Sequence, residues 1–188
     1  MPERRTPIEA FGQSLAELTA AIDDRGAPPP VDRWNPPLCG HSGMRIARDG
    51  TWYHEESPID RPAMVRLFAS VLRREPDGSH ALVTPVEKLT IDVEGTAFRA
   101  TQMAMSGEGE SRRIGVTLDS GDGLILGPEN PLRIVDTDQG PSPRILVRFG
   151  LEAELARPLY YELAEIALAE GHDPPGLWSD GMFFRLEP

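Results

Sequence analysis

Ile59-Asp60-Arg61-Pro62-Ala63-Met64 and Leu155-Ala156-Arg157-Pro158-Leu159-Tyr160 carry the same helix-entry pattern, with arginines 96 residues apart. Leucines follow at the same offset, Leu67 with Leu163 and Leu72 with Leu168. Proline is favoured in the first turn of a helix because its missing N–H is not needed there. A period near a hundred residues is too long for a solenoid, whose units run about 20–50 residues. The pattern therefore predicts a duplicated strand–helix–strand domain.

The sequence around these repeats predicts strands joined by hairpins. Aromatic strand patterns, Thr51-Trp52-Tyr53 and Val147-Arg148-Phe149, precede the two repeats, and turn pairs such as Asp49-Gly50 favour hairpins. Since hairpin turns outnumber βαβ connections, we expect an α+β fold with mainly antiparallel sheets. Asp60 is expected to cap the first repeated helix, whose buried face would run from Met64 to Leu72.

The expected organisation has three parts. Thr6-Pro7-Ile8-Glu9 is a capping box that opens an apolar helical stripe, so residues 1–38 are predicted to form an N-terminal helix and a Pro-rich arm. Residues 39–98 would form the first repeat domain and residues 99–188 the second.

Composition narrows the classes of partner and compartment. The 188 residues carry 19 basic and 30 acidic side chains, a formal charge of −11, which disfavours nucleic acid and anionic membranes as main partners. No apolar stretch approaches the roughly 18 residues of a membrane span. The single cysteine, Cys39, excludes an intrachain disulfide and favours a cytoplasmic protein.

No familiar catalytic or metal-binding signature is present in the sequence. Both Gly-x-x-x-x-Gly-Lys-Ser/Thr and a strand-to-helix Gly-x-Gly-x-x-Gly are absent. Ser179 lies in Trp-Ser-Asp-Gly, outside a Gly-x-Ser-x-Gly elbow. Cys39 and His41 supply two ligands where zinc needs three or four, and Cys39 is expected to be a buried thiol. The sequence thus predicts no enzyme activity, no metal and no cofactor.

Arginine, tryptophan and the only lysine supply the candidate ligand-binding residues. Arginine recognises anions through two parallel hydrogen bonds, and tryptophan offers a stacking face. Together they suit a small anionic, planar, nucleotide-type ligand in a cleft between the two halves. The structural alternative is that the helix-entry arginines pair with Glu56 and Glu152. The candidates are Arg45, Trp52, Arg61, Glu87, Lys88, Arg148, Arg157 and Trp178.

Several motifs together resemble a known bacterial family. They are Trp34-Asn35-Pro36-Pro37 with Cys39-Gly40, Met44-Arg45-Ile46 with Asp49-Gly50-Thr51-Trp52, Leu82-Val83-Thr84-Pro85-Val86-Glu87-Lys88, and Val147-Arg148-Phe149-Gly150-Leu151-Glu152-Ala153 with Trp178-Ser179. Over residues 34–185 the chain resembles the family catalogued as domain of unknown function 1285. The resemblance implies a duplicated core with a pleckstrin-homology-like C-terminal half, a nucleotide-type ligand and a role in signal transduction, without established catalytic residues.

Three functional hypotheses follow from the sequence. The first is a non-enzymatic ligand-binding module. The second is an enzyme that uses Glu87, Lys88 or Ser179. The third is an interaction scaffold of pleckstrin-homology type, which would meet a protein partner through exposed sheet edges and the Pro-rich arm.

Overall fold

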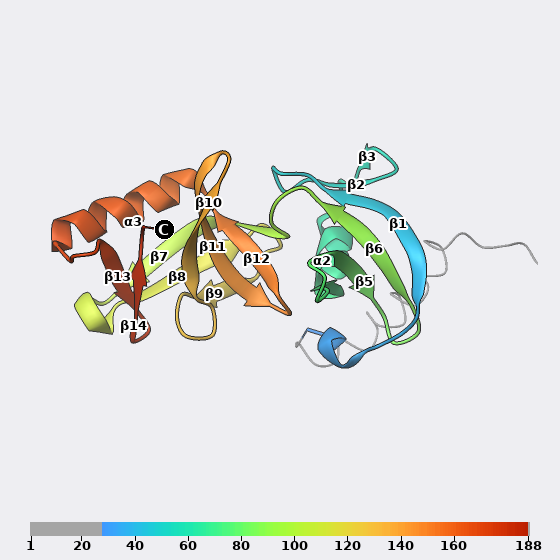
Figure 1. The fold of residues 1–188 in the computed structure, drawn as a ribbon, viewed down its shortest axis with the longest axis horizontal. Coiled ribbons are helices and arrows are strands. Elements are labelled where there is room, and N and C mark those ends of the chain that lie inside the picture. The colour runs from blue at the N-terminus through green and yellow to red at the C-terminus, as the bar shows by residue number, and fades with distance from the viewer. Residues whose placement is uncertain (1–27, 188) are drawn as a thin grey trace, which may run out of the picture. The chain divides into compact units, whose positions relative to one another are not determined.

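The computed structural model describes residues 28–187, so the helix predicted within residues 6–26 lies outside the described part. The chain divides between Gly95 and Thr96 into two compact units (Figure 1). Each unit is described by itself below. Strands make up 46% of the described residues.

The N-terminal unit is a curved six-stranded sheet with one α-helix. The sheet has the order β3-β2-β1-β6-β5-β4, and it curls around α2 (Figure 1). Only the central pair, β1 with β6, is parallel. The elements are η1 (Val31–Arg33), β1 (Leu38–Ile46), β2 (Trp52–His54), β3 (Ser57–Pro58), α2 (Pro62–Ser70), β4 (Leu72–Arg74), β5 (His80–Val83) and β6 (Lys88–Val93).

Apolar side chains on the concave face of the sheet form the core of this unit. Met44, Ile46 and Trp52 on the first two strands are buried, as are Phe68 and Ala69 on α2. The expected hairpin at Asp49-Gly50 is present, with Ile46 opposite Trp52. The helix is shorter than expected. It begins at Pro62 after an N-cap at Arg61, and Leu72 already belongs to β4.

The Pro-rich arm is held against the edge of this sheet. One guanidinium nitrogen of Arg73 donates to the carbonyls of Val31 and Trp34, both at 2.7 Å. Val31 is fully buried. On the other side of Arg73, Glu75 accepts from Arg73 Nε at 2.7 Å and from Lys88 Nζ at 2.8 Å. These contacts make residues 31–34 part of the N-terminal unit.

The C-terminal unit contains a second six-stranded sheet, a helix and a small hairpin. The sheet has the order β10-β11-β12-β7-β8-β9, again with one parallel pair, β12 with β7. Gly171 ends the helix in the left-handed conformation that glycine adopts without strain. The elements are β7 (Phe98–Ser106), η2 (Gly109–Ser111), β8 (Arg113–Leu118), β9 (Gly123–Ile125), β10 (Leu132–Thr137), β11 (Gly140–Arg148), β12 (Leu151–Leu155), α3 (Arg157–Glu170), β13 (Gly176–Ser179) and β14 (Met182–Arg185).

The two sheets share one topology, which is the actual duplication. In each sheet two three-strand meanders meet where the first and last strands pair in parallel. The helices break the symmetry, because α2 lies between the third and fourth strands whereas α3 follows the sixth. The predicted α+β fold of strand–helix–strand halves is therefore wrong, and so is the equivalence of Arg61 with Arg157. The halves are β-rich, and their likeness lies in strand order.

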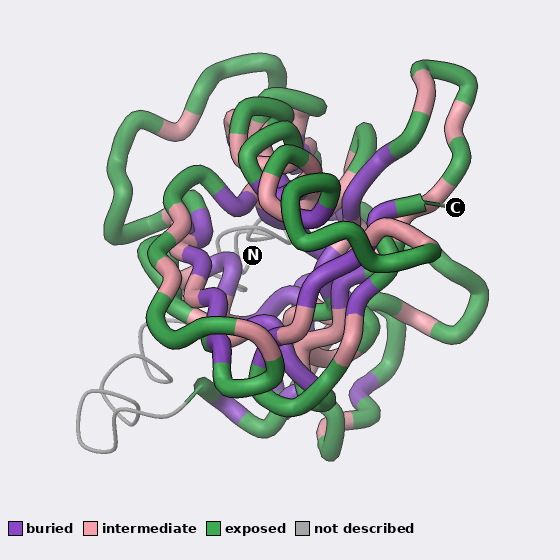
Figure 2. Tube along the Cα trace, turned by 90° about the vertical axis from the view of Figure 1, so that its left-hand side faces the viewer, coloured by how far each residue is buried: buried purple, intermediate pink, exposed green. Residues whose placement is uncertain are grey.

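Burial follows the strands in both units (Figure 2). Alternating positions on β8, namely Ile114, Val116 and Leu118, are at most 2% exposed, as expected for a strand with one face on a core. Within the described residues no helix is long and apolar enough to cross a membrane.

Candidate ligand pocket in the N-terminal unit

A pocket of about 410 Å³ lies between the β2–β3 hairpin and the beginning of α2. This volume falls in the range of small-molecule sites. Its walls come from β2, β3, the connection that follows β3, and α2, which are close in sequence, and from Met44 on β1. The lining residues are Met44, His54, Ser57, Pro58, Ile59, Asp60, Arg61, Met64 and Phe68.

The hairpin wall depends on an unusual tight turn. His54 pairs with Ser57, so Glu55 and Glu56 form a two-residue connection, and both have positive φ, 47° and 65°. Hairpins of this type normally place Asn or Gly at such positions. Gly43 on the facing strand also has positive φ, and its carbonyl accepts from the amide of Glu55 at 2.9 Å. Backbone strain of this kind is often found at functional sites.

The floor of the pocket is apolar and rigidly supported. Met44 is 1% exposed and Phe68 is 7% exposed. The ring of Phe68 stacks on Trp52, with 6.3 Å between ring centroids and an interplanar angle of 19°. Met64, one turn before Phe68 on the same face of α2, also lines the pocket and is 38% exposed. An apolar ligand group would therefore bind against a preformed surface.

Polar groups also line the pocket. His54 Nε2 is buried and makes no hydrogen bond with a described residue. Asp60 and Arg61, both exposed, form no salt bridge within the described chain. A buried nitrogen without a partner costs about 1–3 kcal/mol, so a ligand that binds His54 would recover this energy.

Two of the sequence candidates in the N-terminal unit meet at this pocket. Arg61 lines it, and Trp52 supports its floor. Arg45 does not, because it follows Met44 on β1 and points to the opposite face of the sheet. There Arg45 lies 4.3 Å over the ring of Tyr53 and pairs with Glu94 at 2.8 Å.

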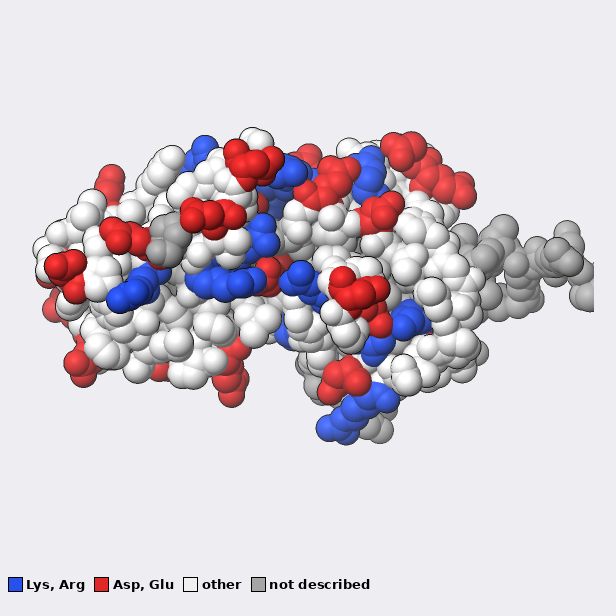
Figure 3. Space-filling model, viewed as in Figure 1, with Lys and Arg blue, Asp and Glu red and all other residues white. Residues whose placement is uncertain are grey.

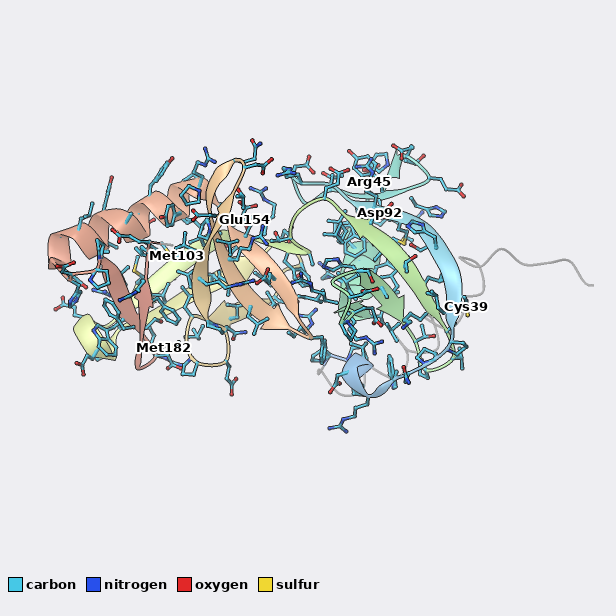
Figure 4. The ribbon with its side chains drawn as sticks, viewed as in Figure 1. Cys39, Arg45, Asp92, Met103, Glu154 and Met182 are labelled. Carbon is cyan, nitrogen blue, oxygen red and sulfur yellow. The ribbon has the colours of Figure 1, made fainter. Side chains whose placement is uncertain are left out.

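On that outer face Arg45 also pairs with Glu56. Glu56 lies 3.3 Å from Arg45, so the alternative in which Glu56 holds a helix-entry arginine is not what the structure shows. Figure 4 places Arg45 and the exposed Cys39 at opposite ends of β1. The expectation of a buried Cys39 thiol is wrong.

Glu87 and Lys88 lie at the connection between β5 and β6 and do not line the pocket. Lys88 belongs to the Arg73–Glu75 network, with only 17% of its side chain exposed. One carboxylate oxygen of Glu87 is buried without a hydrogen-bond partner in the described chain. Burial raises the pKa of Glu87.

The remaining candidates lie on separate elements of the C-terminal unit. Arg148 on β11 pairs with Asp122 at 3.2 Å and lies 5.2 Å from the ring centroid of Phe98. Arg157 is the exposed first residue of α3. Trp178 on β13 meets Phe183 edge to face, with 5.4 Å between ring centroids.

Glu152 is paired with Arg133 and Arg144, not with Arg157. Acidic and basic side chains are interspersed on the face shown in Figure 3. No group of three metal-ligating side chains is found within residues 28–187.

Ser179 is fully buried, and its hydroxyl accepts from the amide of Ile114 at 2.9 Å and donates to the carbonyl of Leu126 at 2.6 Å.

Sequence reasoning missed His54 and assigned Asp60 to helix capping. Neither residue stands in a recognisable motif. The available signal was that both precede the Arg61-Pro62 helix entry, by seven residues and by one.

Comparison with known proteins identifies the family. The model described as "Domain of unknown function (DUF1285), N-terminal domain" matches residues 29–96, and "Protein of unknown function (DUF1285), C-terminal domain" matches residues 97–186. The chain belongs to the DUF1285 family. A search of curated proteins gives no match.

Two solved DUF1285 structures are similar to this chain. The protein from Silicibacter pomeroyi is 42% identical, with a TM-score of 0.80, and the match covers 91% of this chain and 93% of that one. The protein from Shewanella baltica is 23% identical, with a TM-score of 0.53 over 65% of this chain and 90% of that one, and it shows the fold alone.

Proposed function

We propose that this DUF1285 protein is a cytoplasmic, non-enzymatic ligand-binding module. Its N-terminal unit would take up a small organic ligand with an apolar body and an anionic group. The observation that carries the proposal is the pocket beside α2, where His54 Nε2 is buried without a partner in the described chain, next to an apolar floor. Apolar lining with a few convergent polar groups is the usual composition of a ligand site.

Arg61 supports an anionic group on the ligand. Arg61 is exposed at the rim and has no salt bridge within the described residues. It also lies at the N-terminus of α2, where the helix dipole favours negative charge. A single anionic group beside Arg61 would leave the apolar body of the ligand against Met44 and Phe68.

Binding without chemistry would make the protein a sensor of its ligand, in keeping with a role in signal transduction. The enzyme hypothesis has less support. Ser179 has its hydroxyl engaged on both sides, and Lys88 is held by Glu75 at 2.8 Å. Neither residue offers a free reactive group.

The proposal is tested by a thermal-shift screen of small organic acids, nucleotides and amino acids. Each hit is repeated on Met64→Trp, which fills the pocket, and on Leu146→Trp. These two positions match closely, since both side chains are 38% exposed and Leu146 lies in the other unit. At a ligand concentration 100 times Kd, binding stabilises the folded protein by about 2.7 kcal/mol.

We expect the stabilisation to disappear in Met64→Trp and to persist in Leu146→Trp. Hits that stabilise both variants equally would place binding elsewhere. In that case the interaction-scaffold hypothesis would gain support.

A further inference from the structure

The two charges at the rim of the pocket have opposite signs. Asp60 and Arg61 are consecutive, both line the pocket, and both are exposed. Neither forms a salt bridge within residues 28–187. A ligand group at this rim therefore meets one carboxylate and one guanidinium.

This arrangement is poorly suited to a highly charged anion. A phosphate dianion beside Arg61 would also lie near Asp60, and like charges at short range repel each other. Asp60 and Arg61 are the only Asp, Glu, Lys or Arg residues in the lining, so their formal charges cancel.

The geometry points to a zwitterionic ligand of the amino-acid type with an apolar side chain. Arg61 would bind its carboxylate, Asp60 its ammonium, and Met44, Met64 and Phe68 its side chain. This inference rests on the proposed function and names the class of its ligand. His54 Nε2 supplies a further hydrogen bond to the ligand's polar end.

The size and shape of the site agree with this class. A volume of about 410 Å³ accommodates one apolar amino acid. The buried sulfur of Met44 and the ring of Phe68 provide soft, aromatic surroundings for an aliphatic or aromatic side chain. The positive end of α2 lies on the side of Arg61, where the carboxylate would bind.

The test compares ligands that differ by one charged group. Phenylalanine, 3-phenylpropanoate, 2-phenylethylamine and adenosine monophosphate are titrated calorimetrically into the full chain, with leucine and methionine as further zwitterions. An exposed ion pair contributes up to about 1 kcal/mol, so losing either charge should weaken binding about threefold to fivefold.

Two variants test which charged residue of the pocket binds which charged group of the ligand. In Asp60→Asn we expect phenylalanine and 3-phenylpropanoate to bind equally, and in Arg61→Gln we expect phenylalanine and 2-phenylethylamine to bind equally. Arg66→Gln is the control, because Arg66 is an exposed residue of α2 outside the pocket lining. It should leave all affinities unchanged.

The outcomes separate this inference from the proposed function. If 3-phenylpropanoate or adenosine monophosphate binds more tightly than every amino acid, the zwitterion is wrong and the ligand-binding module stands. If no compound binds in a way that Met64→Trp abolishes, both proposals are overturned.

Discussion

Replacing Glu75 by glutamine should destabilise the N-terminal unit more than the same replacement of an exposed glutamate. Glu75 receives hydrogen bonds from Arg73 Nε at 2.7 Å and from Lys88 Nζ at 2.8 Å. The side chains of all three residues are at most 17% exposed. Glutamine keeps the shape of the side chain but leaves the cations of Arg73 and Lys88 without the negative charge that both contact.

The expected cost follows from these contacts. Removing one partner of a buried ion pair costs about 3–5 kcal/mol. The glutamine oxygen still accepts one hydrogen bond, so we expect about 3 kcal/mol. That loss is a large fraction of the 5–15 kcal/mol by which folded domains are stable. It should also loosen Val31 and Trp34, whose carbonyls bind Arg73.

Urea unfolding followed by tryptophan fluorescence measures this cost. Among the described residues, Trp34 and Trp52 belong to the N-terminal unit and Trp178 to the other, so a Trp178→Phe background isolates the first unit. Glu94→Gln is the matched control, because Glu94 pairs with Arg45 at 2.8 Å but is 45% exposed. The control should cost less than about 1 kcal/mol. Equal costs for the two variants would refute the reasoning.

The same network predicts a pH dependence. Burial alone would raise the pKa of Glu75, but hydrogen bonds from Lys88 and Arg73 outweigh it and hold that pKa below its usual range. The stabilisation is therefore complete above the unfolded pKa of about 4.3 and is lost as the pH falls through the folded pKa. The difference in unfolding free energy between wild type and Glu75→Gln should stay constant above about pH 6 and shrink below about pH 4.5.

Three further variants test other parts of the structure. Burial raises the pKa of Glu87, so Glu87→Gln should stabilise the protein by about 1 kcal/mol at neutral pH and by less as acid protonates the wild-type carboxyl. Ser179→Ala should lower the unfolding free energy by about 1–3 kcal/mol, since its buried hydroxyl makes two backbone hydrogen bonds. Replacing Glu55-Glu56 by Asn-Gly should stabilise the hairpin by about 1 kcal/mol in thermal unfolding.

The sequence predicted helix entries and hairpins better than it predicted the fold. Arg61-Pro62 and Arg157-Pro158 both begin helices, because proline suits the first helical turn wherever a helix starts. The shared Arg-Pro helix entry was therefore mistaken for a repeat of the whole domain. The actual duplication lies in the strand order, and strands share only an alternation of buried and exposed residues, which leaves little identity to detect.

The pocket could be predicted only in part. Arg61 was singled out as a helix-entry arginine and Trp52 as an aromatic strand residue. His54 precedes a tight turn in which Glu55 and Glu56 both have positive φ angles. Glutamate gives no sequence signal for such a turn, so this wall of the pocket was not predictable. Arg45 was excluded by the side to which it points on β1, which depends on the strand register.

Methyl NMR of methionine-labelled protein tests the central claim most directly. Met44 and Met64 line the pocket, whereas Met103, Met105 and Met182 belong to the C-terminal unit and serve as internal controls. On titration with phenylalanine, we predict saturable shifts confined to Met44 and Met64 that His54→Phe weakens. Shifts confined to the C-terminal methionines, or no saturable shift with any ligand from the thermal-shift screen, would contradict a ligand site beside α2.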